Sequence, residues 1–328
     1  MSLKKSARST PCDLCQESDF EVVAKLDRKR RPMPTVICRN CGLVSHEKLP
    51  TDAELDLYYS VQYRSDYHGE FVPSPHRVVR AWEVGQSLLQ SLQRHMRPDD
   101  HVFEVGAGIG CTVKSFENAG FAASGIEPGE GFCNYAIDEV GSDVQMLRLA
   151  DVPAEPTYDF VLLVHVIEHF SSPRRSIEQI RQLLRPGGRL YVECPNVGAP
   201  HAAPAKLFHF AHIHNFTAHT VQMMCESSGF ALKEKMASDD QRVVRLLFEA
   251  NDNYDLRLIP GSYEATLNGI FRYNTLTYHL RPEYIQNRWR RAAGFVSNHV
   301  MPRRRLQQIF SRTASKTDDV QETDRRAA

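Results

Sequence analysis

The stretch LVHVIEHFSSP, residues 163–173, holds three side chains that can bind a metal ion or move a proton. His165, Glu168 and His169 are spaced i, i+3 and i+4, so on a helix all three would share one face. The order H-x-x-E-H can hold a zinc ion when it lies on a helix. Whether this stretch is a metal site therefore depends on the element that contains it.

Four of the eight cysteines form two C-x-x-C pairs, CDLC and CRNC, which are separated by 22 residues. These are Cys12, Cys15, Cys38 and Cys41. Two such turns direct four thiolates at one tetrahedral metal ion, which makes a closed structural site. Residues 20–40 add two alternating apolar runs around a polar turn, the pattern of a zinc-ribbon hairpin. We predict a structural Zn²⁺ here, with a redox pair as the alternative. The remaining cysteines are expected to be small core residues.

A glycine turn follows the first strand pattern of the central part of the chain. In EVGAGIG, Gly106, Gly108 and Gly110 suit a tight turn and close approach of the backbone to a ligand. Glu127 lies 17 residues after Gly110, at the end of the next apolar run, where a carboxylate can accept both ribose hydroxyls. This pairing predicts a nucleotide cofactor. The spacing leaves open whether it is a dinucleotide or S-adenosylmethionine.

A histidine-rich segment, FHFAHIHNFTAHT, spans residues 208–220. It follows a predicted strand, and ligands of α/β sheets bind beyond the carboxyl ends of strands. Histidine titrates close to neutral pH and can therefore act as a general base. His212 and His214 are our candidate bases, and we expect the neighbouring histidines to cap a helix or to pack at the surface.

Elements that position these residues alternate between strand and helix patterns, which predicts a doubly wound α/β sheet. One amphipathic helix is expected at residues 76–95, before the alternation begins. Within the alternation, Ser172 is the expected N-cap of a helix whose first residue is Pro173. The expected strands lie within residues 101–110, 120–129, 158–166, 188–195, 231–240 and 242–251.

The chain has 328 residues and 42% hydrophobic content, enough for one large core with small additions. We expect residues 1–11 to be disordered, and a tyrosine-rich linker or lid to follow the cysteine module. The full set of expected segments is 1–11 (disordered), 12–45 (zinc ribbon), 46–75 (linker), 76–250 (core), 251–312 (helical extension) and 313–328 (disordered tail).

Charge and hydropathy exclude several classes of protein. Forty basic and forty acidic side chains cancel, which argues against a nucleic-acid binder. The apolar runs are far shorter than the ~20 residues that cross a bilayer, and the N-terminus lacks the apolar core of a signal peptide. We therefore expect a cytoplasmic protein. Residues 288–316 are basic with interspersed apolar residues, so a weak peripheral contact with anionic lipid is an alternative to a solvated helix end.

Four motifs in order, VFEVGAGIG, GIEP, YDFVLLVHVIEHFSSP and LLRPGGRLYVECPN, resemble the motif set of class I S-adenosylmethionine-dependent methyltransferases over residues 76–250. The resemblance implies a Rossmann-like sheet of seven strands. It also implies that Glu104 and residues 106–110 hold the methionine part of the cofactor and that Glu127 holds its ribose. By the same resemblance Ala150 and Asp151 would border the adenine, and His165 would line the cofactor near its methyl group.

The four-cysteine module and the tyrosines before this core make the chain similar to bacterial methyltransferases of sugar and cell-envelope pathways. That resemblance implies that Tyr59, Tyr63 and Tyr67 frame the substrate, together with His212, which fits the H-x-x-x-F-S pattern of those enzymes. The chain lacks their full H-E-H-F-S-Y-F-S string and is too short for the large C-terminal domain of the sugar C-methyltransferases. We therefore expect O-methylation of a carbohydrate or similar small polar metabolite, with N-methylation as the alternative. The alternatives are an RNA-directed module that uses the ribbon and a non-catalytic zinc-stabilised scaffold.

In such a fold the VHVIEHF stretch begins inside a strand, so its histidines need not share a helical face. Small-RNA 2′-O-methyltransferases and certain quinone O-methyltransferases carry E-x-x-E-H at this place and bind a metal there. In this chain His165 replaces the first glutamate. Two alternatives stay open: a divalent ion held by Glu168, His169 and a histidine from residues 209–214, and a structural role in which these side chains orient the loop.

Overall fold

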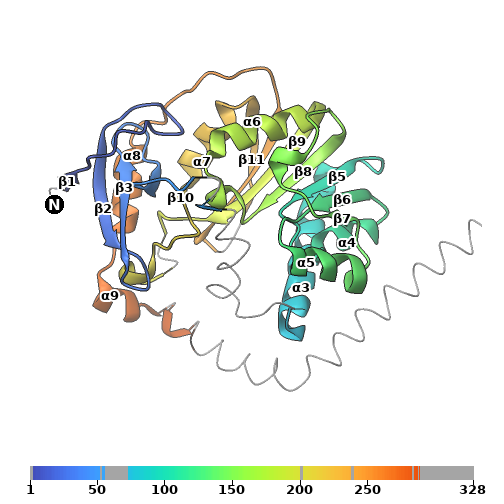
Figure 1. Cartoon of the computed structure of the whole chain (residues 1–328), viewed down its shortest axis with the longest axis horizontal. Helices are drawn as coiled ribbons and strands as arrows, with labels where there is room; N and C mark the ends of the chain where they lie inside the picture. The colour runs from blue at the N-terminus through green and yellow to red at the C-terminus, as the bar shows by residue number, and fades with distance from the viewer. Residues whose placement is uncertain are drawn as a thin grey trace, which may run out of the picture. The chain divides into compact units, whose positions relative to one another are not determined.

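The computed structural model describes residues 3–51, 54–55, 73–199, 202–237, 240–282, 284–286 and 288 (Figure 1). The chain divides into two compact units. The first joins residues 1–63 to residues 149–285, and the second joins residues 64–148 to residues 286–328. The cysteine module thus belongs to the same unit as the histidine-rich segment, and the glycine turn belongs to the other unit.

The central strands form a mixed sheet of seven strands. In the first unit the order of the strands is β11 (Phe230–Lys235), β12 (Val243–Ala250), β9 (Leu184–Pro195) and β8 (Tyr158–Val164). In the second unit it is β5 (His101–Val105), β6 (Ala122–Ile126) and β7 (Val144–Gln145). The pairs β8–β9, β5–β6 and β6–β7 are parallel, whereas β12 is antiparallel to both β9 and β11. The predicted Rossmann-like α/β class is confirmed.

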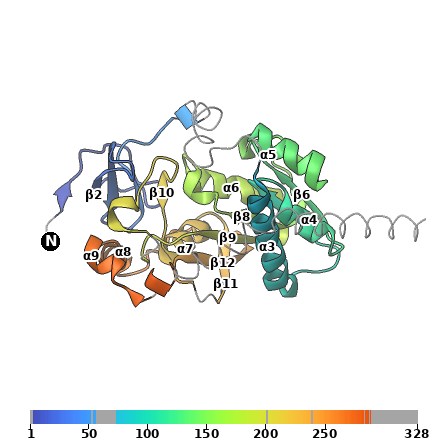
Figure 2. The ribbon, with the colours of Figure 1, turned by 90° about the horizontal axis from the view of Figure 1, so that it is seen from below.

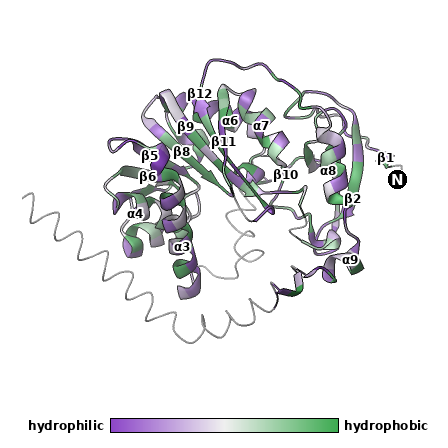
Figure 3. Cartoon of the chain, turned by 180° about the vertical axis from the view of Figure 1, so that it is seen from behind, coloured by the Kyte–Doolittle hydropathy of each residue, from purple (hydrophilic) through white to green (hydrophobic). Residues whose placement is uncertain are grey.

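In the first unit, helices α6 (Pro173–Leu183) and α7 (Ala218–Glu226) pack against each other and against the strands (Figures 1 and 3). Ser172 caps α6 by accepting a hydrogen bond from the backbone of Arg175, and Pro173 is its first residue, as predicted. The helix buries Ile177, Ile180 and Leu183, which share the face directed at the core. Strand β8 is buried from Phe160 to Leu163, as expected of a strand covered on both faces.

In the second unit, α3 (Pro75–Leu92) matches the amphipathic helix predicted at residues 76–95 and packs against α4 (Cys111–Glu117). The two helices approach closely at Gly85. A Cβ atom there would lie 2.7 Å from Ser115 Oγ and 2.9 Å from the carbonyl oxygen of Cys111. A third helix, α5 (Glu130–Tyr135), follows β6. This unit therefore supplies a rigid support for the glycine turn between β5 and α4.

A smaller antiparallel sheet contains the cysteine module. Its order is β1 (Lys4–Lys5), β2 (Phe20–Leu26), β3 (Pro32–Cys38), β4 (Val44–His46) and β10 (His214–Asn215). We call it the ribbon sheet. Strands β2 and β3 are the predicted hairpin, whereas β10 comes from the histidine-rich segment far along the chain (Figure 2). The ribbon sheet is therefore completed by residues from outside the cysteine module.

The expectation that residues 1–11 are disordered is wrong for the described part of this segment. Strand β1 pairs with β2, and the Arg8 side chain is buried. Its guanidinium donates to Ser45 Oγ and to the carbonyl oxygens of Thr10, Pro11 and His46. These bonds satisfy the donors of the buried cation, and that is why the segment is ordered.

Helices α8 (Ser262–Ile270) and α9 (Thr275–His279) lie in the predicted C-terminal helical extension. Helix α8 approaches the ribbon sheet so closely that a Cβ atom on Gly42 would lie 2.7 Å from the carbonyl oxygen of Ser262. Gly42 also has a φ of 77°, which suits a tight turn directly after the second cysteine pair. Within the described ranges, no helix has both the length and the hydropathy that a bilayer crossing requires. The tail predicted from residue 313 and nearly all of residues 288–316 lie outside those ranges.

Candidate functional site

The glycine turn between β5 and α4 has three left-handed glycines, Gly106, Gly108 and Gly110, with φ of 73°, 57° and 73°. The amides of Gly106 and Ala107 both donate to the carbonyl oxygen of Ile126, which fixes the turn to the end of β6. A Cβ atom on Gly110 would lie 2.0 Å from Ser142 Oγ, so this position accepts only glycine without rearrangement. Around Gly108 there is open space at the same position.

Glu127 follows β6 and reaches back to the glycine turn. Its carboxylate accepts from the amide of Gly108 at 3.0 Å and from the amide of Gly129 at 2.7 Å. These bonds orient the carboxylate at the glycine turn. The arrangement suits a ligand that presents two adjacent hydroxyls.

Glu104 lies in β5, immediately before the turn, and is buried. Its Oε2 atom has no hydrogen-bond partner among the residues that the structure describes. Burial raises the pKa of this carboxyl to about 8; a hydrogen bond from Thr112 opposes the rise and Glu127 adds to it. An unpartnered carboxyl in this position suits a ligand that brings a cation or a hydrogen-bond donor.

Two residues predicted at the adenine, Ala150 and Asp151, lie in the short 3-10 turn η4 (Leu149–Asp151). Both are exposed. The turn is tied to α6, because the side-chain amide of Gln179 donates to the carbonyl oxygen of Leu149 at 2.5 Å. Tyr59, Tyr63 and Tyr67, predicted at the substrate, lie outside the described residues.

Directly after β8, the 3-10 turn η5 (Ile167–His169) places a buried carboxylate among histidines. Glu168 is 2% exposed, and its Oε1 atom lies 3.6 Å from Nδ1 of His165 and 3.8 Å from Nε2 of His212. Neither carboxylate oxygen has a hydrogen-bond partner in the described part of the chain. Glu168 is therefore a buried carboxylate that a proton or a cation would stabilise.

His169 and His212 complete this group, which we call the Glu168 cluster. Their rings meet edge to face with centroids 5.1 Å apart, and one ligand atom each of Glu168, His169 and His212 lies within 4.8 Å of the others. Nδ1 of His169 lies 2.7 Å from the carbonyl oxygen of Ala211, which joins η5 to the histidine-rich segment. The cluster brings together His169 and His212, which are 43 positions apart in the sequence. This grouping is one of the two alternatives that the sequence left open.

His165 lies beside this cluster in a left-handed conformation, with φ of 55°. Its Nε2 atom lies 3.4 Å from Glu193 Oε1, so the ring bridges Glu193 and Glu168. Packing of protein atoms around the ring lowers the pKa of His165, but the two carboxylates outweigh this effect and raise it to about 10. A left-handed conformation is rare outside glycine and is concentrated at functional sites.

Glu193 is a site residue that our sequence reasoning missed. It accepts from Tyr191 Oη at 2.7 Å and from Arg245 Nε at 2.8 Å. Burial raises the pKa of Glu193, but the hydrogen bonds from His165, Arg245 and Tyr191 lower it to about 2. The sequence pattern that could have revealed Glu193 is the alternation of side chains along β9, which puts Tyr191 and Glu193 on one face.

The prediction of His214 as a general base is not compatible with its position. The residue lies in β10 and is 0% exposed, and burial lowers its pKa to about 3. Its Nδ1 lies 3.2 Å from the carbonyl oxygen of Phe170, where it acts as a donor inside the fold. His212, two residues earlier, is the candidate base that remains.

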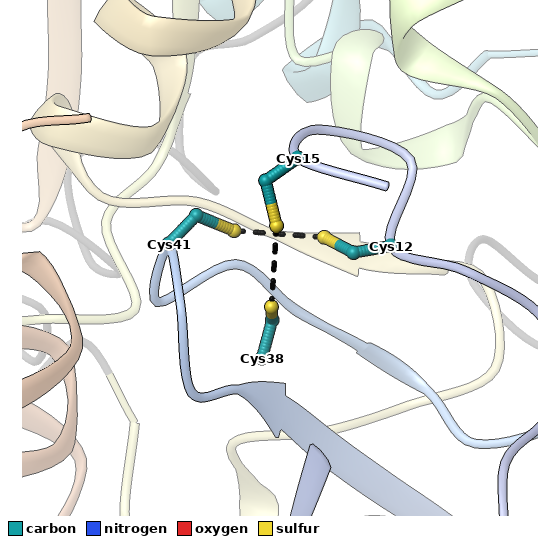
Figure 4. A group of neighbouring side chains, drawn as sticks. All are labelled: Cys12, Cys15, Cys38 and Cys41. Atoms are coloured by element: carbon teal, nitrogen blue, oxygen red, sulfur yellow. Dashed lines mark hydrogen bonds between the residues drawn. The ribbon is translucent and has the colours of Figure 1, made fainter. Parts of the chain in front are cut away.

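The four predicted metal ligands converge on one point (Figure 4). Cys12 Sγ and Cys41 Sγ are 3.5 Å apart, as are Cys15 Sγ and Cys38 Sγ. Four sulfurs bound tetrahedrally at Zn–S distances of about 2.3 Å are roughly 3.8 Å from one another. Four thiols at this spacing fit a tetrahedral ion with little movement.

Comparison with known proteins finds similarity over the central part of the chain. Residues 77–235 match a family model described as a methyltransferase domain. An uncharacterised protein of Mycobacterium tuberculosis is 25% identical over 154 residues, which cover 44% of this chain and 49% of that protein. The ubiquinone biosynthesis O-methyltransferase of Aeromonas salmonicida is 28% identical over 163 residues, 44% of this chain and 65% of that protein.

Among solved structures, magnesium protoporphyrin IX methyltransferase from Synechocystis PCC 6803 with bound SAH aligns with a TM-score of 0.47 and 14% identity. The alignment covers 61% of this chain and all of that chain. This chain spans about half the length of the Mycobacterium tuberculosis protein that it matches. The ribbon sheet and α8 lie outside the matched residues 77–235, except for β10.

Proposed function

We propose that the methyltransferase domain at residues 77–235 transfers a methyl group from S-adenosylmethionine to a hydroxyl of a carbohydrate or similar small polar metabolite. The observation that carries the proposal is the buried Glu104 carboxyl, whose Oε2 atom has no partner in the described ranges. A buried carboxyl needs a donor or cation, and the ammonium group of S-adenosylmethionine is one. Glu127, already held by two amides, would accept the ribose hydroxyls.

S-adenosylmethionine supplies an activated methyl group, because its sulfonium is a good leaving group. The residues of the chain then have two tasks: to hold the acceptor in line and to take its proton. His212 is the proposed base. Its Nε2 lies 3.8 Å from the Glu168 carboxylate, which stabilises the imidazolium that forms when the proton is taken. A carboxylate beside the imidazole would support His212 as a general base.

Oxygen as the methyl acceptor is favoured by the similarity to a ubiquinone biosynthesis O-methyltransferase. A polar acceptor is favoured by the side chains of the Glu168 cluster and of His165, all of which are titratable. We place the protein in the cytoplasm, because a reducing compartment keeps the four cysteines of the ribbon sheet available as thiolate ligands. We propose Zn²⁺ as the ion that they bind, in a structural role.

A second candidate for acceptor activation is a divalent ion on the Glu168 cluster. Two imidazoles and one carboxylate are a donor set that suits zinc, manganese or iron. The carboxylate oxygens that lack partners in the described part of the chain favour it. When bound, such an ion would polarise the acceptor oxygen, while Ala211 would keep the His169 ring oriented.

The test has two parts. Titration calorimetry of the wild-type protein with S-adenosylmethionine is expected to give micromolar binding; absence of heat from correctly folded protein would overturn the proposal. Incubation with a panel of nucleotide sugars and S-adenosylmethionine is expected to add one methyl group to one of them by mass spectrometry.

Glu168→Gln and a chelator separate the two modes of activation. If His212 acts alone, turnover persists in a chelator that leaves the cysteine site loaded. If an ion is required, the chelator and Glu168→Gln abolish turnover, and manganese or zinc restores it in the wild type alone.

A further inference from the structure

The ribbon sheet is bound to both segments that build the Glu168 cluster. Asp13 lies inside the first C-x-x-C pair, between Cys12 and Cys15. Its Oδ1 accepts from Ser172 Oγ at 2.7 Å, and its Oδ2 accepts from the amide of Arg174 at 2.8 Å. The residues bound are the N-cap and the second residue of α6, four and six positions after Glu168. The first cysteine pair thus fixes the chain immediately beyond η5.

The second cysteine pair reaches the other segment of the cluster. Strand β4 begins three residues after Cys41 and pairs with β10, with Ser45 opposite His214. The amide of His46 also donates to the carbonyl oxygen of Ile213 at 3.0 Å. Ile213 directly follows His212, so this pairing fixes the position of the backbone that carries the proposed base.

The two attachments are joined to each other inside the core. The buried His214 ring donates from Nδ1 to the carbonyl oxygen of Phe170, which lies in the link between His169 and Ser172. The contacts therefore form a continuous path from the first cysteine pair to the start of α6, then to β10, to β4 and to the second cysteine pair. The two ends of this path come together at the four cysteine side chains (Figure 4).

We propose that Asp13 is a positioning residue for the Glu168 cluster, and that the ion bound by the four cysteines sets the separation of Glu168 from His212 by holding the two pairs together. Release of the ion lets the pairs part, so that His212 moves relative to Glu168. The effect on turnover rests on the proposed function. The effect on the geometry of the cluster does not, since it concerns only contacts within one unit.

The test compares Asp13→Ala, Asp13→Asn and Asp19→Asn. Asp19 is the matched control, because it lies in the same module and the side-chain partners that the structure describes for it are Lys5 and Arg39 at the surface. Each variant is checked for zinc content and thermal midpoint. Nitrogen-15 NMR of the His169 and His212 rings, assigned with His169→Gln and His212→Gln, reports the geometry of the cluster independently of activity.

Asp13→Ala is expected to shift both ring spectra and to lower kcat by about 10- to 100-fold, since displacement of a catalytic group by about 1 Å has this effect. The affinity for S-adenosylmethionine, whose proposed residues Glu104 and Glu127 lie in the other unit, is expected to change less than twofold. Asp13→Asn keeps one acceptor oxygen and is expected to give an intermediate loss. Asp19→Asn is expected to match the wild type.

Two further measurements make the proposal falsifiable if Asp13→Ala folds poorly. Ser172→Ala removes the partner hydroxyl, and adding it to Asp13→Asn should cost less than the sum of the two single effects, because both act on one contact. Removal of the ion with a chelator from the wild type should shift the same ring spectra. Unchanged ring spectra in both the ion-free protein and the Asp13 variants would overturn the proposal, even if the methyl acceptor stays unidentified.

Discussion

Nδ1 of His169 lies 2.7 Å from the carbonyl oxygen of Ala211. A carbonyl can only accept, so Nδ1 is the donor in this contact. A metal ion could therefore bind this ring at Nε2. This one contact ties η5 to the histidine-rich segment and fixes which ring nitrogen is the donor.

Substitution of the proposed base should separate catalysis from cofactor binding. His212→Gln is expected to lower kcat by about 10²- to 10⁴-fold, the usual contribution of a general base. The dissociation constant for S-adenosylmethionine is expected to stay within twofold. His219→Gln is the control, because its ring contacts Ser262 Oγ in α8 and lies apart from the proposed chemistry. Full turnover by His212→Gln would show that another group takes the proton.

Cofactor binding should release protons near neutral pH. The carboxyl of Glu104, with its pKa at about 8, is mostly protonated at pH 7, whereas a bound ammonium favours the ionised form. Binding is therefore expected to release up to one proton at pH 7 and fewer at pH 9. Calorimetry in buffers with different ionisation enthalpies measures this release.

Two variants check the assignment of that proton. Glu104→Gln cannot release it and is expected to raise the dissociation constant by about 10- to 100-fold, as for a lost hydrogen bond to a charged group. Glu139→Gln, at an exposed carboxyl in the same unit, should behave as the wild type. Proton release that persists in Glu104→Gln would show that another group releases the proton.

The charge on His165 should depend on Glu193. Glu193→Gln removes one of two neighbouring carboxylates and is expected to lower the pKa of His165 from about 10 by roughly 1–3 units. Proton NMR titration of the ring measures this shift. Glu249→Gln is the control: it removes the surface ion pair of Glu249, in β12, with Lys233, in β11, and should leave the pKa of His165 unchanged.

The interaction of His165 with Glu193 should make the stability of the protein depend on pH. The pKa of His165 is raised above its ordinary value of 6.5, so its contribution to the free energy of unfolding is full below pH 6.5 and is lost as the pH rises toward 10. The stability difference between wild type and Glu193→Gln should therefore shrink over this range. A difference that grows with pH in urea unfolding would contradict the proposed charge state.

Two glycines of the glycine turn between β5 and α4 should differ in their tolerance of substitution by alanine. Gly108→Ala adds a Cβ atom in open space and is expected to cost about 1 kcal/mol of stability from its left-handed backbone. Gly110→Ala adds the same strain and a collision with Ser142, so a loss of about 3 kcal/mol is expected. Urea unfolding measures both. Equal losses would mean that Ser142 can move aside without cost.

Local patterns were sufficient to predict the α/β fold class and the tight glycine turn, whereas the seven strands of the sheet were expected from the resemblance to a known family. The alternation of strands and helices fixes the fold class, and the glycines act on their own backbone angles. The cap of α6 is equally local, since Ser172 and Arg175 are three residues apart.

The errors arose where one long-range contact decides the outcome. His212 and His214 have the same residue type and neighbourhood in sequence, but pairing of β10 with β4 buries His214 completely. Likewise, Arg245 lies opposite Glu193 only because β12 pairs with β9 in one register. Neither pairing leaves a signal in the local pattern of residues, so neither could be predicted from it.

The strand β10 has a consequence for protein engineering. Because it contributes the last strand of the ribbon sheet, the cysteine module and the histidine-rich segment are complementary surfaces that must match. A chimaera that exchanges only residues 12–46 with those of a related protein would join a foreign strand edge to the native β10. Recombination of the cysteine module should therefore transfer residues 3–51 and 202–217 together, although the two segments are far apart in the sequence.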